Sequence, residues 1–228
     1  MNESAQAIEK TFREIGKEHG YESVSAVFNE FKDFKIKWRR SCGWIEFEVS
    51  DYLINAPENV LKGIAETIFN RICKRKSPKY SQEMLDYMNS PEFIKINRPK
   101  YLKRAKNLTR KSEGEYRDLK DSYQRLIALG LTEHDDDLVL TWTKQPNIKK
   151  IGYCSVLMKT IAISSIFDTK DIPAFVMDYV LYHELIHLDR GFDPLDRNHD
   201  ENFRTQENMH PMHDEAEEFL KKLRLCLE

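Results

Sequence analysis

The chain has 228 residues, a mass of 27.0 kDa, a formal net charge of −2 at pH 7 and a pI near 6.4. This length can bury one substantial core or two small ones, so folding requires neither a disulfide framework nor a structural metal. The small net charge excludes a global field that would demand nucleic acid or an anionic membrane as partner. No basic and apolar leader begins the chain, and no run approaches the roughly 18 apolar residues that span a bilayer. We therefore expect a soluble cytoplasmic protein.

Helical periodicity predicts two helices near the start of the chain. The first covers about residues 4–19 and stops at Gly20. The second carries four apolar residues, Val24, Val27, Phe28 and Phe31. Residues 34–38 and 44–49 then alternate in character around a glycine-containing turn, which predicts two half-buried strands. A helix with an apolar stripe follows at residues 57–72 and begins with a proline.

Residues 73–111 form a basic segment, in which twelve Lys or Arg residues face only three acidic ones. Its interleaved aromatic residues are Tyr80, Tyr87, Phe93 and Tyr101. Such a segment can follow a phosphate backbone while its aromatic rings stack on bases. It can equally be a solvated helical face with its aromatic rings turned inward, and we favour this second interpretation.

The second half of the chain predicts one helix, three strands and a further helix. The first helix lies around residues 116–129, and the strands lie at residues 138–143, 151–157 and 160–164. Pro173 then begins the last helix of this series. The whole chain is expected to have an α+β fold.

The two halves repeat several features in the same order, which suggests a degenerate internal repeat. The matched features are Trp38 with Trp142, Gly43 with Gly152, residues 47–50 with 161–164, and Pro57 with Pro173. Thr67 then falls at the position of His183, and Arg71 at the position of His187. We expect residues 1–115 to form a related region without ligands and residues 116–228 to form the second domain.

The sequence His183-Glu184-Leu185-Ile186-His187 is an HExxH motif on the helix that begins at Pro173. Two imidazoles four residues apart lie on one face of a helix and can converge on one zinc ion. Glu184 is turned about 100° from His183, so its carboxylate lies beside the metal and can act as a base.

A catalytic zinc site needs a third protein ligand and leaves one position for water. Gly191 predicts the end of the HExxH helix, and Asn198 and Glu201 have the spacing of a capping box for the next helix. His199 would then lie in the first turn of that helix. The expected ligands of one Zn²⁺ ion per chain are His183, His187 and His199.

Other side chains compete for the third position. The carboxylate candidates are Asp193, Glu201 and Glu207. Asp193 has the spacing of the third ligand in HExxHxxGxxH sites, but Arg190 stands where that pattern needs glycine. Glu201 has an alternative role as a helix cap. The remaining histidines are expected in surface or turn positions: His19, His134, His210 and His213.

These motifs resemble the YgjP-like and SprT-like zincin metallopeptidases. The resemblance lies in Ile151–Ser155, residues 160–164, Pro173, Asp178–His187 and Asn198–Phe203. It implies a zincin-like fold, in which a small mixed β-sheet packs against the helix that carries HExxH. It also implies that His199 is the third ligand and that a sheet edge beside that helix receives an extended peptide. Ile151 and Tyr153 depart from the family pattern.

We therefore expect a zinc metallopeptidase in which Glu184 accepts a proton from water activated by the metal. Tyr153 is a candidate for stabilising the oxyanion. The same site could hydrolyse a non-peptide amide. The alternative function is a non-catalytic zinc-containing adaptor that binds nucleic acid through the basic segment. The sequence carries no signal for the identity of the substrate or for the oligomeric state.

Overall fold

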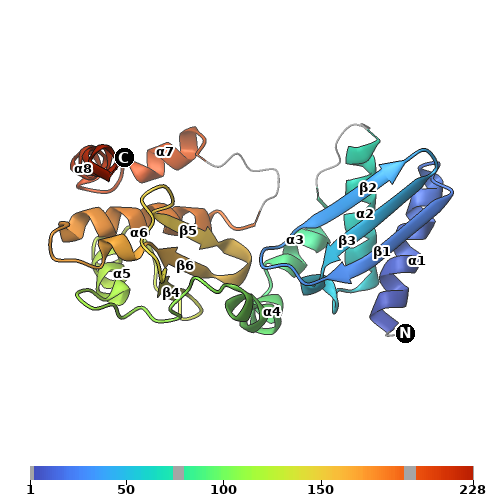
Figure 1. The fold of residues 1–228 in the computed structure, drawn as a ribbon, viewed down its shortest axis with the longest axis horizontal. Coiled ribbons are helices and arrows are strands. Elements are labelled where there is room, and N and C mark those ends of the chain that lie inside the picture. Colours follow the sequence, from blue (N-terminus) through green and yellow to red (C-terminus); the bar gives the residue numbers. More distant parts are fainter. Residues whose placement is uncertain (1–2, 74–79, 193–198, 228) are drawn as a thin grey trace. The chain divides into compact units, whose positions relative to one another are not determined.

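The chain divides into two compact units, Met1–Arg104 and Ala105–Glu228. The structure is a computed structural model that describes residues 3–73, 80–192 and 199–227 (Figure 1). The described residues form eight α-helices and two three-stranded sheets, a mixed α/β architecture. Among them, no helix combines the length and the apolar character needed to cross a membrane.

The N-terminal unit is a three-stranded sheet with helices packed on one face. Its elements are α1 (Glu3–Glu18), β1 (Ser23–Asn29), β2 (Ile36–Ser41), β3 (Trp44–Ser50), the 3₁₀ helix η1 (Asp51–Leu53), α2 (Glu58–Ile72), α3 (Gln82–Met88) and α4 (Pro91–Arg104). The strand order is β1-β3-β2, with β1 parallel and β2 antiparallel to β3. The rings of Phe12, Phe47 and Phe69 meet where α1, β3 and α2 pack, with centroids 4.9 to 6.4 Å apart.

The predicted helices at residues 4–19 and 57–72 are confirmed, but the helix predicted over Val24 to Phe31 is wrong. Residues 24 to 29 lie in β1, in which burial alternates and Val24 and Ala26 point into the core, and Phe31 follows the strand. A spacing of four between Val24 and Phe28 fits one face of a strand as well as one face of a helix. Parallel pairing with β3, which is remote in sequence, decides between the two.

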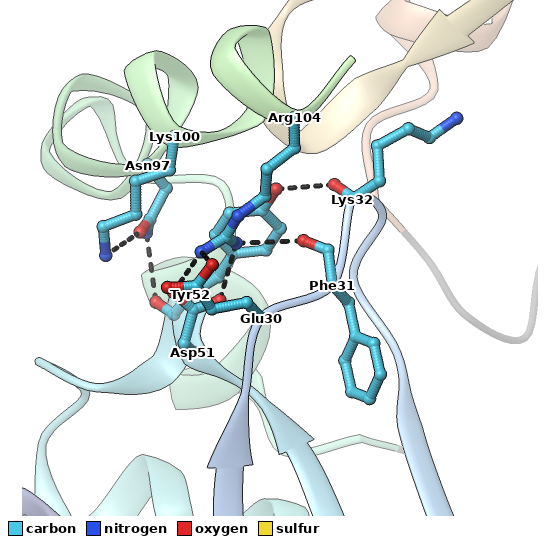
Figure 2. A network of polar contacts seen from close by, with 8 residues as sticks. All are labelled: Glu30, Phe31, Lys32, Asp51, Tyr52, Asn97, Lys100 and Arg104. Atoms are coloured by element: carbon cyan, nitrogen blue, oxygen red, sulfur yellow. Dashed lines mark hydrogen bonds and ion pairs between the residues drawn. The ribbon is translucent and has the colours of Figure 1, made fainter. Parts of the chain in front are cut away.

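A polar network around Arg104 ties α4 to the sheet of the N-terminal unit (Figure 2). The Arg104 guanidinium donates two hydrogen bonds of 2.7 Å to the Asp51 carboxylate and one of 2.9 Å to the Phe31 carbonyl. The amide of Asn97, also on α4, donates to the Tyr52 carbonyl at 3.0 Å. Both partners of the ion pair are mostly buried, because their side chains are 17% and 15% exposed.

Three aromatic residues of the basic segment, Tyr87, Phe93 and Tyr101, are buried or partly buried. Phe93 and Tyr101 on α4 are each 1% exposed. Tyr87 is partly buried and its ring meets that of Phe93 in an edge-on contact at 5.5 Å. Residues 74–79 of the segment lie outside the described residues. Buried rings are not available for stacking on bases.

The C-terminal unit repeats the plan of a mixed three-stranded sheet under helices. Its elements are α5 (Leu119–Ala128), β4 (Val139–Trp142), β5 (Gly152–Ser155), the 3₁₀ helix η2 (Val156–Met158), β6 (Thr160–Ile163), the 3₁₀ helix η3 (Ser165–Phe167), α6 (Ala174–Asp189), α7 (Glu201–Glu207) and α8 (His213–Leu227). The predicted strands and helices of this half are confirmed. α6 packs against β5 and β6, and Arg125 on α5 holds the buried Asp178 on α6 through two hydrogen bonds of 2.7 Å.

The boundary between the units lies earlier than the predicted one between residues 115 and 116. The backbone of Thr109 donates to the Trp142 carbonyl at 2.9 Å, and the Trp142 N–H donates to the Lys111 carbonyl at 3.3 Å. Residues 105–115 therefore belong with the edge of β4. The sequence pattern of this stretch has no period that would indicate such pairing.

The two units have the same topology. In the N-terminal unit, from α1 to α2, the elements follow the order helix, three strands, 3₁₀ helix, helix. The C-terminal unit has the same order from α5 to α6, with the additional 3₁₀ helix η2 before its last strand. In each sheet the last strand is central, parallel to the first and antiparallel to the second. Pro57 and Pro173 both precede the second helix as its N-cap residue. This is the topology that the predicted repeat requires.

Two of the matches proposed from the sequence are nevertheless wrong. Trp38 lies in β2, whereas Trp142 lies in β4, which corresponds to β1. Gly43 lies in the turn between β2 and β3, whereas Gly152 begins β5. The strand registers instead pair Ile36 with Val49 and Gly152 with Ile163, so the equivalent of Gly152 is Ile36.

We expect replacement of Arg104 by alanine to destabilise the N-terminal unit. The change leaves the mostly buried Asp51 carboxylate without its ion pair, which should lower the free energy of unfolding by about 3 kcal/mol. Urea unfolding followed by tryptophan fluorescence measures the change. The control is Arg13→Ala, which removes an exposed pair with Glu9 and should cost less than about 1 kcal/mol. Equal costs for the two variants would contradict the role given to Arg104.

Candidate metal centre

Helix α6 presents His183 and His187 on one face, as the HExxH spacing predicts. The two imidazole centroids are 5.1 Å apart. Pro173 precedes the helix as its N-cap residue, and the helix continues to Asp189 before Gly191 adopts a positive φ of 71°. The apolar residues of the same helix are buried in the core of the unit, so the histidine pair is carried by a firmly packed element.

His199 brings a third imidazole to the same point from the segment before α7. Its ring centroid lies 5.0 Å from that of His183 and 4.9 Å from that of His187. One ring nitrogen of each residue lies within 4.8 Å of the other two. The Nε2 atoms of His183 and His199 are 3.1 Å apart. The structure thus brings together the three residues that the sequence selected.

The position of His199 differs from the predicted first helical turn. α7 begins at Glu201, and its N-cap is Asp200, whose carboxylate accepts the Phe203 N–H at 2.8 Å. His199 therefore precedes the cap, with a φ of 68°, a left-handed conformation that is uncommon for residues other than glycine. The predicted cap residue, Asn198, lies outside the described residues.

An ion pair and a buried ring hold this left-handed turn in place. Arg190, at the end of α6, donates two hydrogen bonds of 2.7 Å to Asp200, and these bonds hold the pKa of the Asp200 carboxyl well below its usual range. Phe203 is fully buried, and its ring centroid lies 4.6 to 5.0 Å from those of the three imidazoles. Backbone strain persists at a site only when the surroundings over-determine it, as they do for His199.

Glu207 is a hydrogen-bond partner of the site. Its Oε1 atom lies 2.6 Å from His183 Nδ1 and accepts a hydrogen bond of 2.9 Å from the Tyr179 hydroxyl. Burial alone would raise the pKa of Glu207, but these two bonds outweigh it and keep that pKa below its ordinary value. An ionised Glu207 fixes the proton of His183 on Nδ1, which leaves Nε2 free to bind a cation.

The pKa values of His187 and His199 are lowered, which favours the neutral imidazole that binds a metal ion. Burial, together with His183 and His199, lowers the pKa of His187 to about 4. Burial and His183 also lower the pKa of His199. Burial opposes protonation of His183 as well, but the hydrogen bond to Glu207 and the charges of Glu184 and Glu207 outweigh it and raise that pKa. Neutral imidazoles bind metal, and a carboxylate partner increases the basicity of the one it contacts.

Glu184 lies beside the three imidazoles but belongs to a different environment. It is 6% exposed, and burial raises its pKa to about 7, against the opposing effects of His183, Lys150 and the Cys154 N–H. Its neighbour on β5 is Gly152, where an added Cβ atom would lie only 2.6 Å from Glu184 Oε1. Glycine at this position therefore gives the carboxylate its space.

Three nitrogen donors of this geometry fit a zinc ion. Tetrahedral zinc with Zn–N bonds of 2.0 to 2.1 Å places its ligand nitrogens roughly 3.3 Å apart. The observed separation between His183 Nε2 and His199 Nε2, 3.1 Å, is close to that value. Among the described residues, the group that could hold a metal ion consists of these three imidazoles, and a site with three protein ligands has one open position.

A cavity of about 210 Å³ adjoins the site in the C-terminal unit. His183, Glu184 and Glu207 are among its lining residues, and Ile151, Val180 and Leu220 provide apolar wall. Cationic residues at the same cavity are Lys149, Lys150 and Arg224. The cavity is large enough to take one side chain of a bound molecule.

The rival side chains that the structure describes lie outside the group of three imidazoles. Asp193 lies outside the described residues, and Glu201 is an exposed residue of the first turn of α7. His134 is exposed, as predicted. His210 lies in a turn, one of the two positions expected for it, but it is not at the surface: it is 4% exposed and packs its ring against Tyr179. Its burial depends on docking of α6, which sequence spacing does not report.

Sequence reasoning missed the supporting residues more than the site itself. It assigned Glu207 only as a rival ligand. It placed Arg190 at the end of one helix and Asp200 at the start of the next, but it predicted neither their ion pair nor the contact of Phe203 with the imidazoles. The spacing of Asp200 and Phe203 is that of an N-cap and its N3 residue, which is a readable signal. The hydrogen bond between Glu207 and His183 joins residues on different helices and has no signature in the sequence.

We expect the protein to retain about one zinc ion per chain and to lose it when His199 is replaced. His199→Ala removes one of three ligands, so the zinc affinity should fall by more than about 100-fold, beyond the loss expected for an outer partner. Competition with a chelator and elemental analysis measure the change. His134→Ala, at an exposed histidine bonded to Asp136, is the matched control and should retain the affinity. Unchanged zinc binding by His199→Ala would remove His199 from the ligand set.

We expect Glu207→Gln to weaken zinc binding by about 10- to 100-fold, because His183 loses its anionic partner while the shape of the side chain is kept. The same chelator competition measures the effect. Glu201→Gln changes an exposed glutamate on the same short helix and should have no effect. If the two variants bind zinc equally well, the His183–Glu207 bond does not contribute to the site.

Comparisons of the chain with protein-family models, with curated proteins and with solved structures find no match. The functional assignment therefore rests on the residues of the centre and on their geometry.

Proposed function

We propose that this protein is a zinc-dependent hydrolase with a zincin-like C-terminal unit, and that it cleaves peptide bonds. The observation that carries the proposal is the meeting of His183, His187 and His199 around one point beside the buried Glu184. The HExxH sequence on a helix and the resemblance to zincin metallopeptidases support the same function.

Zinc, when bound by the three imidazoles, supplies a Lewis acid and lowers the pKa of water toward 7. The protein supplies the proton transfer. Because the pKa of Glu184 is about 7, its carboxylate can accept a proton from water at neutral pH and return it to a leaving amine. Glu207 remains ionised and keeps His183 oriented, so the two glutamates have separate roles.

The edge of the sheet favours an extended substrate. β5 is an edge strand, and the bond from Ser164 N–H to the Ile151 carbonyl sets its register with β6. In this register the backbone N–H and C=O groups of Gly152 and Cys154 point away from β6, toward the open edge of the sheet. At this edge the Cys154 N–H donates a hydrogen bond to Glu184. An extended peptide could pair with this edge and present its carbonyl to the centre.

The adjoining cavity favours a peptide over a small amide. Its apolar wall of Ile151, Val180 and Leu220 can bury one substrate side chain within reach of His183 and Glu184. Tyr153, the candidate for oxyanion stabilisation, does not support that role. It alternates with Gly152 along β5 and so lies on the opposite face of the sheet from Glu184.

We expect Glu184→Gln to retain zinc and to lose peptide hydrolysis by about 10² to 10⁴-fold, because glutamine cannot accept the proton. Hydrolysis of a fluorogenic peptide library and the zinc content are measured on the same samples. Glu215→Gln, at an exposed position in the first turn of α8, is the control and should remain active. A fully active Glu184→Gln variant would exclude the proposed mechanism. Absence of hydrolysis by the zinc-loaded parent across the library would exclude peptidase function.

A further inference from the structure

Strand β2 of the N-terminal unit is an open edge. It lies at one end of the strand order β1-β3-β2 (Figure 1). The Ser50 N–H donates a hydrogen bond to the Lys35 carbonyl. In this antiparallel pair the backbone N–H and C=O groups of every second residue from Lys35 onward, Lys37 and Arg39, therefore point toward β3. The backbone groups of Ile36, Trp38 and Arg40 therefore point away from the sheet. Among the described residues no strand pairs with this edge.

The side chains along this edge are basic on both faces. Lys37 and Arg39 lie on the open face of the sheet, in register with Glu48 and Glu46, and Arg39 is 3.4 Å from Glu46. On the other face Arg40 donates to the Ile72 carbonyl at 3.2 Å. All residues of β2 after Ile36 are exposed.

Trp38 adds an apolar surface to the same edge. It pairs with the buried Phe47 of β3, so its side chain lies on the face that the helices cover. It is nevertheless 45% exposed, because it stands at the margin of that face. A large exposed ring beside outward-facing backbone groups promotes aggregation of a monomer, and the same combination is suited to binding a partner.

We propose that β2 docks an extended, acidic segment of another protein by strand addition. The outward N–H and C=O groups of Trp38 and Arg40 would form the ladder, and Lys37 and Arg39 would attract carboxylates. Strand addition gives affinity through the backbone and specificity through alternate side chains. The bound segment would therefore alternate acidic residues, opposite Lys37 and Arg39, with an apolar residue opposite Trp38.

The charges decide between this occupant and two others. A second copy pairing through the same edge would oppose Lys37, Arg39 and Arg40 with their own like charges, which disfavours self-association. Nucleic acid would bring its phosphates toward Glu46 and Glu48, which share the open face with the cations of β2. An acidic strand has no like charge opposite it on β2. Its carboxylates lie one strand spacing, about 4.8 Å, from Lys37 and Arg39 but about twice that distance from Glu46 and Glu48 on β3.

This docking is independent of the proposed hydrolysis and can be measured in a full-length protein carrying Glu184→Gln, which does not consume the probe. The probe is a fluorescein-labelled peptide of alternating Glu and Val, about ten residues long, titrated at two salt concentrations. We expect saturable binding that weakens as salt rises. Two comparison peptides, one with the same composition in two blocks and one with Lys in place of Glu, should bind at least about tenfold more weakly.

Variants of the edge locate the binding. Lys37→Gln with Arg39→Gln should weaken it about tenfold or more, whereas Lys10→Gln with Lys17→Gln, an equal loss of charge on α1, should not. Trp38→Pro removes an outward N–H that no other strand uses, a change that an edge strand tolerates, and should bind more weakly than Trp38→Ala. Thermal unfolding confirms that each variant is folded.

Specific results would overturn the proposal. Equal binding of the alternating and block peptides would exclude strand addition, and equal effects of the β2 and α1 charge variants would place binding elsewhere. A labelled single-stranded DNA that binds through Lys37 and Arg39 while the peptide does not would make the edge a nucleic-acid site. Self-association lost in Trp38→Pro, without peptide binding, would assign the edge to a second copy.

Discussion

The constraint on which the C-terminal unit depends is the crowding of three imidazoles at one point. Two of them face each other with nitrogens 3.1 Å apart, and among the described residues His183 has a carboxylate partner, Glu207. Such an arrangement is unfavourable without a shared proton or cation. It is maintained by elements that cannot easily relax: the packed helix α6, the clamp between Arg190 and Asp200, and the buried ring of Phe203. These elements hold the three imidazoles in a convergent arrangement that could bind one metal ion, and such support from the surrounding structure is what a precise site requires.

The N-terminal unit shows what the same fold looks like without the residues of the metal centre. It has the same topology, but Thr67, Ile68 and Arg71 stand where the C-terminal unit has His183, Glu184 and His187. Thr67 bonds back to the Gly63 carbonyl at 2.8 Å, and Arg71 bonds the Tyr80 hydroxyl at 3.0 Å. The equivalent of Gly152 is Ile36, a residue that would leave no room for a carboxylate such as that of Glu184. The fold therefore requires none of the four residues compared, His183, Glu184, His187 and Gly152. Their presence together in the C-terminal unit is explained by the chemistry of a site.

The parts of the structure that the sequence predicts are those set by local spacing. HExxH on an apolar helical stripe places two imidazoles and Glu184 without reference to the rest of the chain, and the strands follow from alternation. The helix predicted over Val24 to Phe31 is wrong because the spacing of its apolar residues suits a helix and a strand alike. Pairing with β3, which is remote in sequence, makes this stretch a strand. Burial of His210, the bond from Glu207 to His183 and the boundary at Arg104 all arise from contacts between remote segments. No local pattern encodes them.

The two glutamates at the centre differ only in their surroundings. Glu207 receives hydrogen bonds from His183 and Tyr179, so its charge is stabilised despite burial. Glu184 is buried against Gly152 with a single backbone donor, and its charge is stabilised less, which raises its pKa to about 7. A carboxylate that stays ionised is suited to orient a ligand, and one that titrates near neutrality is suited to carry a proton. In the proposed hydrolase, the difference in hydrogen bonding assigns the orientation of a ligand to Glu207 and the transfer of a proton to Glu184.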